Sequence, residues 1–313
     1  MELHPKLKEL LAAPADPNAT PVEQQSPEEA RAEFERDFAA VDGEKPDIHS
    51  TEEIQIPGPG GPLRLRIYEP GPREGGSGRP ALVYCHGGGY IRGSVESHDS
   101  ACRLIANSSG CVTASVDYRL SPESKFPDAI EDCYAATKWF AENAAAHGAD
   151  GSRLAVGGDS AGGNMAAAVT LMARDRSGPK IAFQLLIYPN TDLAADNESM
   201  RLFSKGYWLD SMPFYIRSYL GSDADRANEL ASPLRASDLS GLPPAYVVTA
   251  GFDPLRDEGK AYAERLAQGG GAVESVCYAN MIHGFTALRA ILPEADEALK
   301  ACGDAVRRSF AGD

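Results

Sequence analysis

Leu154-Ala155-Val156-Gly157-Gly158-Asp159-Ser160-Ala161-Gly162-Gly163 is the stretch around which the rest of the chain is organised. Its first three residues are apolar, as in a buried strand, and a helix of small residues is expected from about residue 161 to 173. Ser160 would then stand on a sharp strand-to-helix turn, the arrangement called a nucleophile elbow. Gly158 and Gly162 leave the space that such a strained turn needs. A glycine-rich turn with a bystander serine would give the same pattern, so the partners of the serine must decide.

A serine hydroxyl becomes a nucleophile only when a base takes its proton and an acid orients that base. Asp253 comes directly after an expected strand that ends at Thr249, where its side chain can reach the carboxyl edge of the sheet. Asp253 also fits an N-cap position before Pro254. Asp257 lies one helical turn further on and is expected to be a partner within a helix or loop. Asp253 is therefore favoured as the acid.

His283 follows the last expected strand and is the only histidine after Ser160. We expect its imidazole to take the Ser160 proton and to return it to the leaving alcohol. Asp253 would fix the imidazole tautomer and stabilise the imidazolium. The order serine, acid, histidine is that of the hydrolases built on a nucleophile elbow.

Three glycines follow another apolar strand, in His86-Gly87-Gly88-Gly89-Tyr90. A glycine run lets the chain curl so that backbone N–H groups point into a site. The expected oxyanion hole consists of the N–H groups of Gly87, Gly88 and Ala161. His86 is expected to brace this loop and not to act as a base.

Continuous apolar strands alternate with helical patterns along the chain. This alternation indicates a mostly parallel sheet covered by helices on both faces, with an antiparallel hairpin at one edge over residues 54–67. The other strands are expected at residues 81–85, 111–116, 154–156, 181–187, 245–249 and 273–278. The helices are expected at residues 99–108, 127–146, 161–174, 255–268 and 294–310.

Two segments stand apart from this rhythm. Ser26 and Glu29 form a capping box that starts a helix ending near Gly43, whose apolar stripe either packs on the main domain or walls a ligand site. The sequence leaves these alternatives open. Between residues 187 and 245 lies an insertion rich in aromatic residues, for which a lid over an apolar pocket is favoured over a packed helical excursion. The stripe consists of Ala30, Phe34, Phe38 and Val41, and the insertion contains Phe203, Tyr207, Trp208, Phe214, Tyr215 and Tyr219.

The composition excludes several classes of function. The chain has 313 residues, of which 43% are hydrophobic, and a net charge of −15 that argues against nucleic acid or an anionic membrane as a partner. No apolar run approaches the length of a membrane span, and the first residues contain no apolar signal core, so a cytoplasmic protein is expected. Six cysteines without a C-x-x-C pair indicate reduced, mostly buried thiols. No nucleotide-binding or zinc-protease motif occurs, which argues against those two classes of function.

Together, these motifs resemble those of the hormone-sensitive-lipase-like branch of the α/β hydrolases, the group that includes bacterial carboxylesterases. The resemblance runs from about Ala81 to the C-terminus. It rests on His86-Gly87-Gly88-Gly89, Asp117-Tyr118-Arg119-Leu120, Pro122-Glu123, Gly158-Asp159-Ser160-Ala161-Gly162-Gly163, Asp253-Pro254-Leu255-Arg256-Asp257 and His283-Gly284-Phe285.

The resemblance implies an α/β-hydrolase fold with a sheet of about eight strands. It also implies hydrolysis of short-chain acyl esters through an acyl-enzyme on Ser160, no metal or cofactor, and frequent homodimerisation. Residues 1–50 would be cap helices and residues 51–313 the catalytic domain, with residues 191–222 as a cap insertion after the sixth strand. The candidates for contact with a small ester substrate are Tyr188, Tyr207, Trp208, Phe214 and Phe285.

Two alternatives use the same scaffold. A non-catalytic ligand receptor is one, but the similar plant hormone receptors have lost the base histidine, whereas His283 is present here. An acyltransferase or amidase with the same triad is the other, and it would differ only in the second nucleophile or the leaving group.

Overall fold

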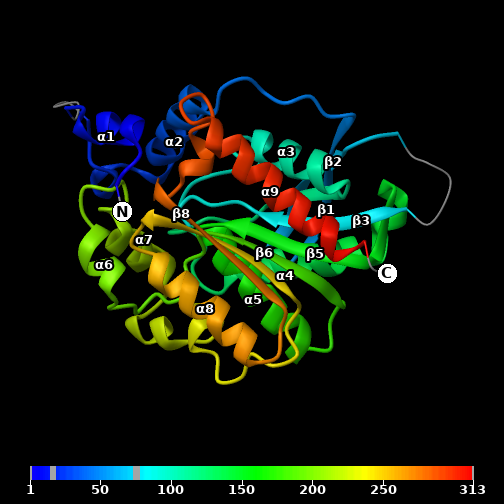
Figure 1. Ribbon diagram of the computed structural model, residues 1–313. Coiled ribbons are helices and arrows are strands. Elements are labelled where there is room, and N and C mark those ends of the chain that lie inside the picture. Colours follow the sequence, from blue (N-terminus) through cyan, green and yellow to red (C-terminus); the bar gives the residue numbers. More distant parts are fainter. Residues whose placement is uncertain (1, 15–18, 73–77, 312–313) are drawn as a thin grey trace.

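The computed structural model describes residues 2–14, 19–72 and 78–311. These residues form an eight-stranded sheet in the order β1-β2-β4-β3-β5-β6-β7-β8 (Figure 1). The strands are β1 (Ser50–Gly58), β2 (Gly61–Glu69), β3 (Arg79–Cys85), β4 (Val112–Asp117), β5 (Ala149–Asp159), β6 (Ile181–Ile187), β7 (Ala245–Phe252) and β8 (Val273–Ile282). From β4 to β8 all neighbours are parallel, and the β1–β2 hairpin is antiparallel at one edge. The expected α/β-hydrolase sheet is confirmed.

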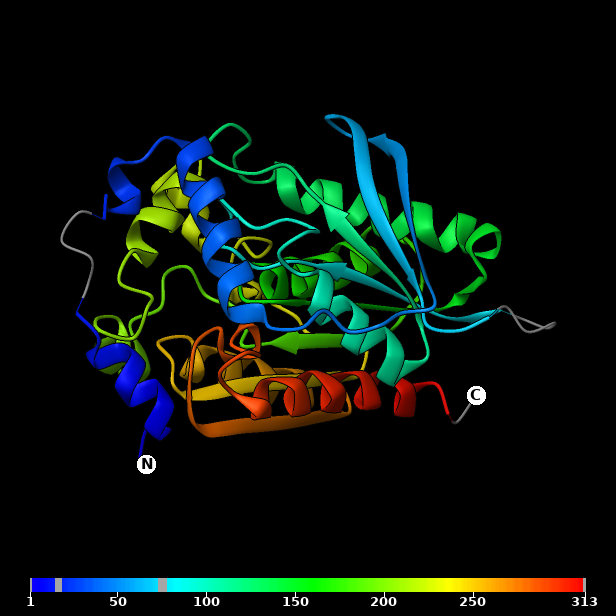
Figure 2. The same cartoon turned by 90° about the horizontal axis from the view of Figure 1, so that it is seen from above.

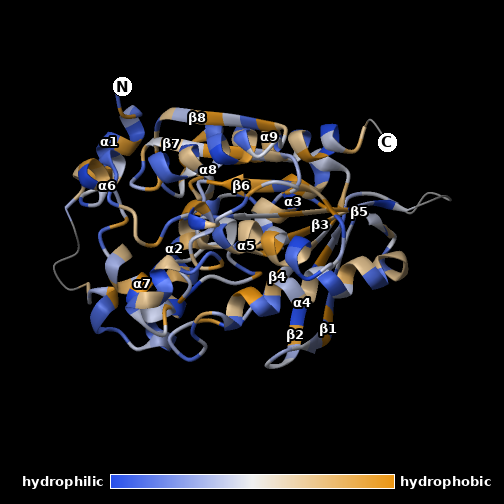
Figure 3. Ribbon diagram, turned by 90° about the horizontal axis from the view of Figure 1, so that it is seen from below, coloured by the Kyte–Doolittle hydropathy of each residue, from blue (hydrophilic) through white to orange (hydrophobic). Residues whose placement is uncertain are grey.

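Helices cover both faces of this sheet (Figure 2). One face carries α3 (Asp99–Ser109) and α9 (Pro293–Ser309), and the other carries α4 (Asp128–Asn143), α5 (Ala161–Asp175) and α8 (Arg256–Gln268). Alternate residues of each central strand therefore enter opposite cores. In Figure 3 the central strands β3 and β6 are mostly hydrophobic, as expected for strands that are buried on both faces.

Several elements extend beyond the residues expected from sequence. β5 begins at Ala149 and not at Leu154, because Arg79 and Pro80 of β3 pair with Ala149 and Asp150 before a register shift. β7 and β8 run on to Phe252 and Ile282, which pair with each other. Polar residues in the added parts of β5 and β8, and a glycine in that of β7, interrupt the apolar runs by which these strands were predicted. One helix is shorter than expected, because α4 ends at Asn143 and a 3₁₀ turn (Ala144–His147) follows.

Two segments outside the sheet lie together at one end of the molecule. α1 (Pro5–Ala12) and α2 (Pro27–Asp42) lie at the same end as α6 (Glu198–Phe203) and α7 (Met212–Tyr219), the helices inserted between β6 and β7 (Figures 1 and 2). α2 starts with the expected capping box of Ser26 and Glu29 and ends at Asp42, followed by Gly43 as its C-cap. None of the helices in the described ranges has the length and apolar character needed to cross a bilayer.

Candidate active site

Ser160 stands between the end of β5 and the start of α5, in a backbone conformation with φ 54° and ψ −117°. Residues other than glycine rarely adopt a positive φ, so the backbone at this turn is strained. A Cβ atom on Gly158 would lie 2.4 Å from the carbonyl oxygen of Cys85, and one on Gly162 would lie 2.0 Å from it. Both positions must therefore be glycine, and the expected elbow geometry is present.

His283 lies between Ser160 and Asp253. Its Nε2 is 2.8 Å from Ser160 Oγ, and its Nδ1 is 2.9 Å from Asp253 Oδ2. The strand register explains this convergence, because Phe252 pairs with Ile282 and the two side chains follow that pair directly. Asp253 is fully buried and His283 is 8% exposed, so water does not compete with these contacts.

Asp253 and Asp257 have different partners. The second carboxylate oxygen of Asp253 accepts the N–H of Leu255 at 2.8 Å, so this residue faces the imidazole and also caps the turn before α8. The expected N-cap position is wrong, because α8 begins at Arg256 with Leu255 as its N-cap, so Asp253 holds the turn before the helix instead. Asp257 accepts the N–H of Ser199 at 2.8 Å and a hydrogen bond from Arg256, and so fastens α6 to the start of α8.

The glycine loop differs from the expectation at one position. The N–H of Gly87 donates to Asp159 Oδ1 at 3.0 Å, which contradicts its expected role as an oxyanion donor. Gly88 and Gly89, with φ 127° and 64°, line the same pocket as Ser160. The part of the loop that borders the pocket thus begins at Gly88, one residue later than the sequence suggested. The reason is that the Asp159 carboxylate accepts the N–H of Gly87.

Asp159 is the centre of a buried cluster beneath the elbow. It accepts hydrogen bonds from Gly87 and from the Tyr84 hydroxyl at 2.9 Å, and its Oδ2 lies 3.3 Å from His98 Nε2. Burial opposes the charge on both partners. The charge of Asp159 nevertheless raises the pKa of His98, and the charge of His98 lowers the pKa of Asp159. The hydrogen bond from the Gly87 N–H to Asp159 Oδ1 fixes the glycine loop relative to the residue before Ser160.

His86 braces the loop in the expected manner. Its ring stacks on Tyr118 with centroids 4.2 Å apart, and its Nδ1 lies 2.8 Å from the carbonyl oxygen of Gly87. Complete burial lowers the pKa of His86 to about 3, so its imidazole is neutral at physiological pH.

A second buried network supports the elbow from the side of α8. Glu258 Oε1 accepts hydrogen bonds from the Asn190 side chain at 2.8 Å and from the N–H of Thr191 at 2.7 Å. Asn190 in turn donates its backbone N–H to the carbonyl oxygen of Ser160 at 3.2 Å and accepts the Tyr90 hydroxyl at 2.9 Å. Burial raises the pKa of Glu258 to about 8, despite these hydrogen bonds. Sequence reasoning missed this residue, because nothing local marks a buried glutamate on a helix.

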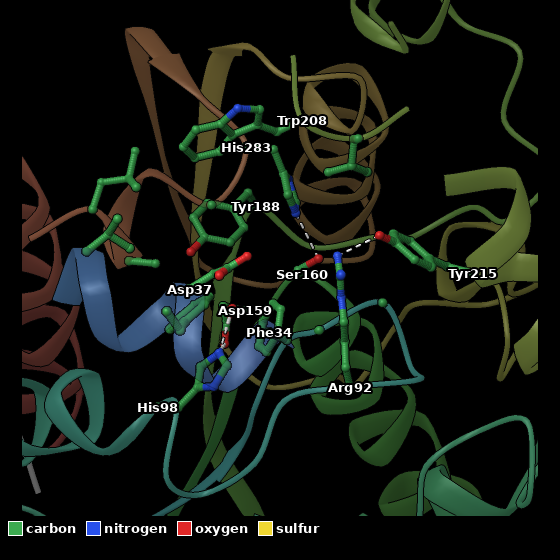
Figure 4. A pocket seen from close by; sticks show the side chains of 18 of the residues that line it. Phe34, Asp37, Arg92, His98, Asp159, Ser160, Tyr188, Trp208, Tyr215 and His283 are labelled. Carbon is green, nitrogen blue, oxygen red and sulfur yellow. Dashed lines mark hydrogen bonds and ion pairs between the residues drawn. The ribbon is translucent and has the colours of Figure 1, made fainter. Parts of the chain in front are cut away.

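A pocket of about 480 Å³ opens above Ser160 and His283 (Figure 4). Tyr188 and Trp208 line it, as expected. The other three expected contact residues lie elsewhere, so their prediction is wrong. Tyr207 packs on Phe203 and Phe252, Phe214 is not among the lining residues and its ring contacts Tyr215, and Phe285 is fully buried against Tyr188 and Tyr278.

The pocket walls come mainly from the two segments outside the sheet. α2 contributes Phe34, Phe38 and Val41 of its apolar stripe. The stripe also packs on the main domain, since Phe38 contacts the His98 ring and Val41 lies against the core, so both expected arrangements occur together. The insertion contributes Leu209 and Tyr215 besides Trp208. Sequence reasoning also missed Arg92, whose side chain in Figure 4 extends toward the part of the pocket where Ser160 and Tyr215 lie. Within the described residues, no group of three or more metal-ligating side chains is placed to hold a metal ion.

Comparison with known proteins gives concordant matches. A family model described as alpha/beta hydrolase fold matches residues 82–287. The carboxylic ester hydrolase LipN of Mycobacterium tuberculosis is 44% identical over 249 residues, which cover 77% of this chain but only 65% of LipN. The ester hydrolase EH1AB1 from the metagenome of Lake Arreo, solved with a derivative of bipyridine phosphonate, has a TM-score of 0.94 at 39% identity, covering 98% of this chain and 99% of that one. A hyperthermophilic esterase from the archaeon Pyrobaculum calidifontis has a TM-score of 0.91 at 42% identity, with coverage of 98% and 99%.

Glu258 gives the stability of the protein a dependence on pH. Between its ordinary pKa of 4.5 and the raised value of about 8, the native state holds a proton that the unfolded chain has lost. The contribution of Glu258 to the free energy of unfolding therefore falls as pH rises through this window. We expect Glu258→Gln, which keeps the neutral shape, to flatten the decline measured by urea unfolding at pH 5.5, 7 and 8.5. Glu264→Gln, an exposed change on the same helix, is the control, and equal slopes in wild type and Glu258→Gln would contradict this account.

Proposed function

Because the chain belongs to the alpha/beta hydrolase fold family, in its hormone-sensitive-lipase-like branch, we propose that it hydrolyses carboxylic esters of short acyl chains. Ser160 is the proposed nucleophile, His283 the base and Asp253 the acid. The relatives named carboxylic ester hydrolase or esterase support the reaction class.

The single observation that carries the proposal is the pair of contacts made by His283. An imidazole whose Nε2 is 2.8 Å from a serine oxygen, and whose Nδ1 is 2.9 Å from a buried carboxylate, has the geometry of a general base with its orienting acid. The same contacts disfavour the non-catalytic receptor, because binding a ligand needs no such base.

In the proposed acylation, His283 Nε2 accepts the Ser160 proton while Oγ attacks the carbonyl carbon of the ester. The Asp253 carboxylate accepts the Nδ1 hydrogen and stabilises the imidazolium. The imidazolium then protonates the departing alcohol, and the acyl group stays on Ser160. Water, deprotonated by the same imidazole, attacks the acyl-enzyme and releases the acid together with the free serine.

Developing charge on the carbonyl oxygen needs donors. We assign this role to the N–H groups of Gly88, Gly89 and Ala161. Gly88 and Gly89 border the pocket, and Ala161 is the first residue of α5, where a helix has no carbonyl of its own to bond the N–H. Each such donor typically contributes about 3–4 kcal/mol to the transition state. The α5 dipole adds to this field.

Residues 1–50 and the insertion of residues 191–222 are proposed to form the cap over the catalytic domain. Support comes from the pocket, which is lined by α2 on one side and by Trp208, Leu209 and Tyr215 on the other. The confined, largely apolar space suits a short acyl chain. A homodimer and a cytoplasmic location stay predictions; the six cysteines are free thiols, which is compatible with a reducing compartment.

Ser160→Ala removes the proposed nucleophile without removing a buried contact of any size. We expect p-nitrophenyl acetate hydrolysis to fall by at least about a thousandfold, while the thermal unfolding midpoint stays near that of the wild type. Assays with the matching anilide and with added alcohol acceptors separate an esterase from an amidase or acyltransferase. Turnover unchanged in a folded variant would falsify the mechanism.

Asp253→Asn and Asp257→Asn separate the catalytic acid from its neighbour. The first change removes the carboxylate that faces His283, so we expect kcat to fall by about three to four orders of magnitude. The second weakens the contact of α8 with α6 and should lower kcat by less than about tenfold. Steady-state kinetics with p-nitrophenyl acetate measure both, and equal losses would refute the assignment of Asp253.

Trp208→Ala and Tyr207→Ala test the pocket wall, because the two aromatic residues are adjacent but only Trp208 borders the cavity. We expect Trp208→Ala to shift the acyl-length optimum toward longer chains in a series of p-nitrophenyl esters. Tyr207→Ala should keep the wild-type optimum and lower stability, because its ring packs on Phe203 and Phe252. A shift in the Tyr207 variant alone would show that the wall is misassigned.

A further inference from the structure

Arg92 introduces a cation into a pocket that is otherwise mostly apolar. It follows the glycine loop, and its backbone N–H donates to the carbonyl oxygen of Gly88 at 3.3 Å. Its guanidinium carbon lies 4.8 Å from the ring centroid of Phe34 on α2 and 4.9 Å from that of Tyr215 on α7. One terminal nitrogen also donates to the Tyr215 hydroxyl at 2.5 Å. Two aromatic rings and one hydrogen bond therefore hold the guanidinium in a fixed orientation.

This guanidinium has no carboxylate partner. Within the described residues, no carboxylate oxygen comes within 4.0 Å of it, and its buried Nε has no hydrogen-bond partner. Two other partly buried arginines differ, since Arg66 pairs with Glu53, and Arg289 pairs with Asp42 and Asp296. A permanently charged side chain with unused donors, directed into a cavity, is available for a ligand.

The acidic side chains around the pocket are engaged elsewhere. Glu33 accepts a hydrogen bond from Gln25 at 2.6 Å, and Asp37 is exposed, 3.6 Å from Arg36. The pKa of Glu23 is lowered first by the Ser211 hydroxyl and only lastly by the charge of Arg92. These acids moderate the positive field, but they do not occupy the guanidinium.

We propose that Arg92 binds a carboxylate of the substrate, so that the enzyme selects esters carrying an acid group a few bonds from the ester that is cleaved. The proposal rests on the esterase function and names a substrate class for the same site. The two oxygens of a carboxylate can accept two parallel hydrogen bonds from the guanidinium. The surrounding apolar walls make the attraction between the two charges stronger than it would be in water. The acid group can belong to the acyl half or to the alcohol half of the ester.

Two pairs of esters test this selection in the full-length enzyme. Methyl hydrogen glutarate against methyl valerate places the acid on the acyl half, and 4-acetoxybutyrate against butyl acetate places it on the alcohol half. The measured quantity is the ratio of kcat/KM for the charged ester to that for its neutral partner. Because both values come from one preparation, the ratio does not depend on how much of a variant is folded.

We expect Arg92→Gln to lower this ratio by about tenfold or more in at least one pair, mainly through KM. Arg92→Lys should give an intermediate ratio, since it keeps the charge but loses the fork. Arg307→Gln, an exposed change on α9 that does not line the pocket, should leave the ratio unaltered. The pair that responds identifies the half of the ester that carries the acid.

The proposal is overturned if Arg92→Gln lowers charged and neutral esters equally, because Arg92 would then only clamp α2 against α7. It is also overturned if the wild type shows no higher ratio than Arg92→Gln. Both results leave the esterase function intact. Absence of turnover for every ester, charged or neutral, would instead refute the proposed function itself.

Discussion

The hydrogen bond between His283 and the buried carboxylate of Asp253 is the interaction on which the site depends. It exists because β7 and β8 are paired as far as Phe252 and Ile282, so that the next residue of each strand leaves the sheet at the same level. With Asp253 fully buried, a shift of one residue in this register would leave an unpaired charge in the interior, at a cost of several kcal/mol. Sheet pairing and imidazole orientation are thus parts of one constraint.

The strained turn at Ser160 is held by buried polar groups on two sides. Asp159 fastens it to Tyr84 and the glycine loop, and Asn190 fastens its carbonyl oxygen to Glu258 of α8. Such networks stabilise one backbone arrangement, because a broken hydrogen bond in the interior leaves a polar group without water. A positive φ at a serine persists only under this kind of support.

The proposed reacting groups and the residues that line the pocket come from different parts of the chain. The carboxyl ends of the parallel strands hold the proposed reacting groups, as is usual in open α/β sheets. The walls of the pocket come in part from α2 and α7, which contact each other through Arg92 and its two aromatic neighbours, and the proposed selection among esters rests on them. Changes in these walls can alter selectivity without disturbing the hydrogen bonds beneath them.

The sequence by itself determined the alternation of strands and helices, the edge hairpin, the elbow, and the placement of Ser160, Asp253 and His283 directly after three of the strands, β5, β7 and β8. These features follow from local sequence patterns, namely apolar runs, glycines at positions where a side chain would clash, and helix-capping residues. Only the tertiary structure decided that Gly87 serves Asp159, that Tyr215 and not Phe214 faces the cavity, and that Glu258 and Arg92 belong to the site. Each of those outcomes depends on contacts between segments far apart in the chain, such as Asn190 with Glu258 or Phe34 with Arg92. Local propensity carries no information about such contacts, because the geometry that creates them arises only when the sheet and its two outer segments pack together.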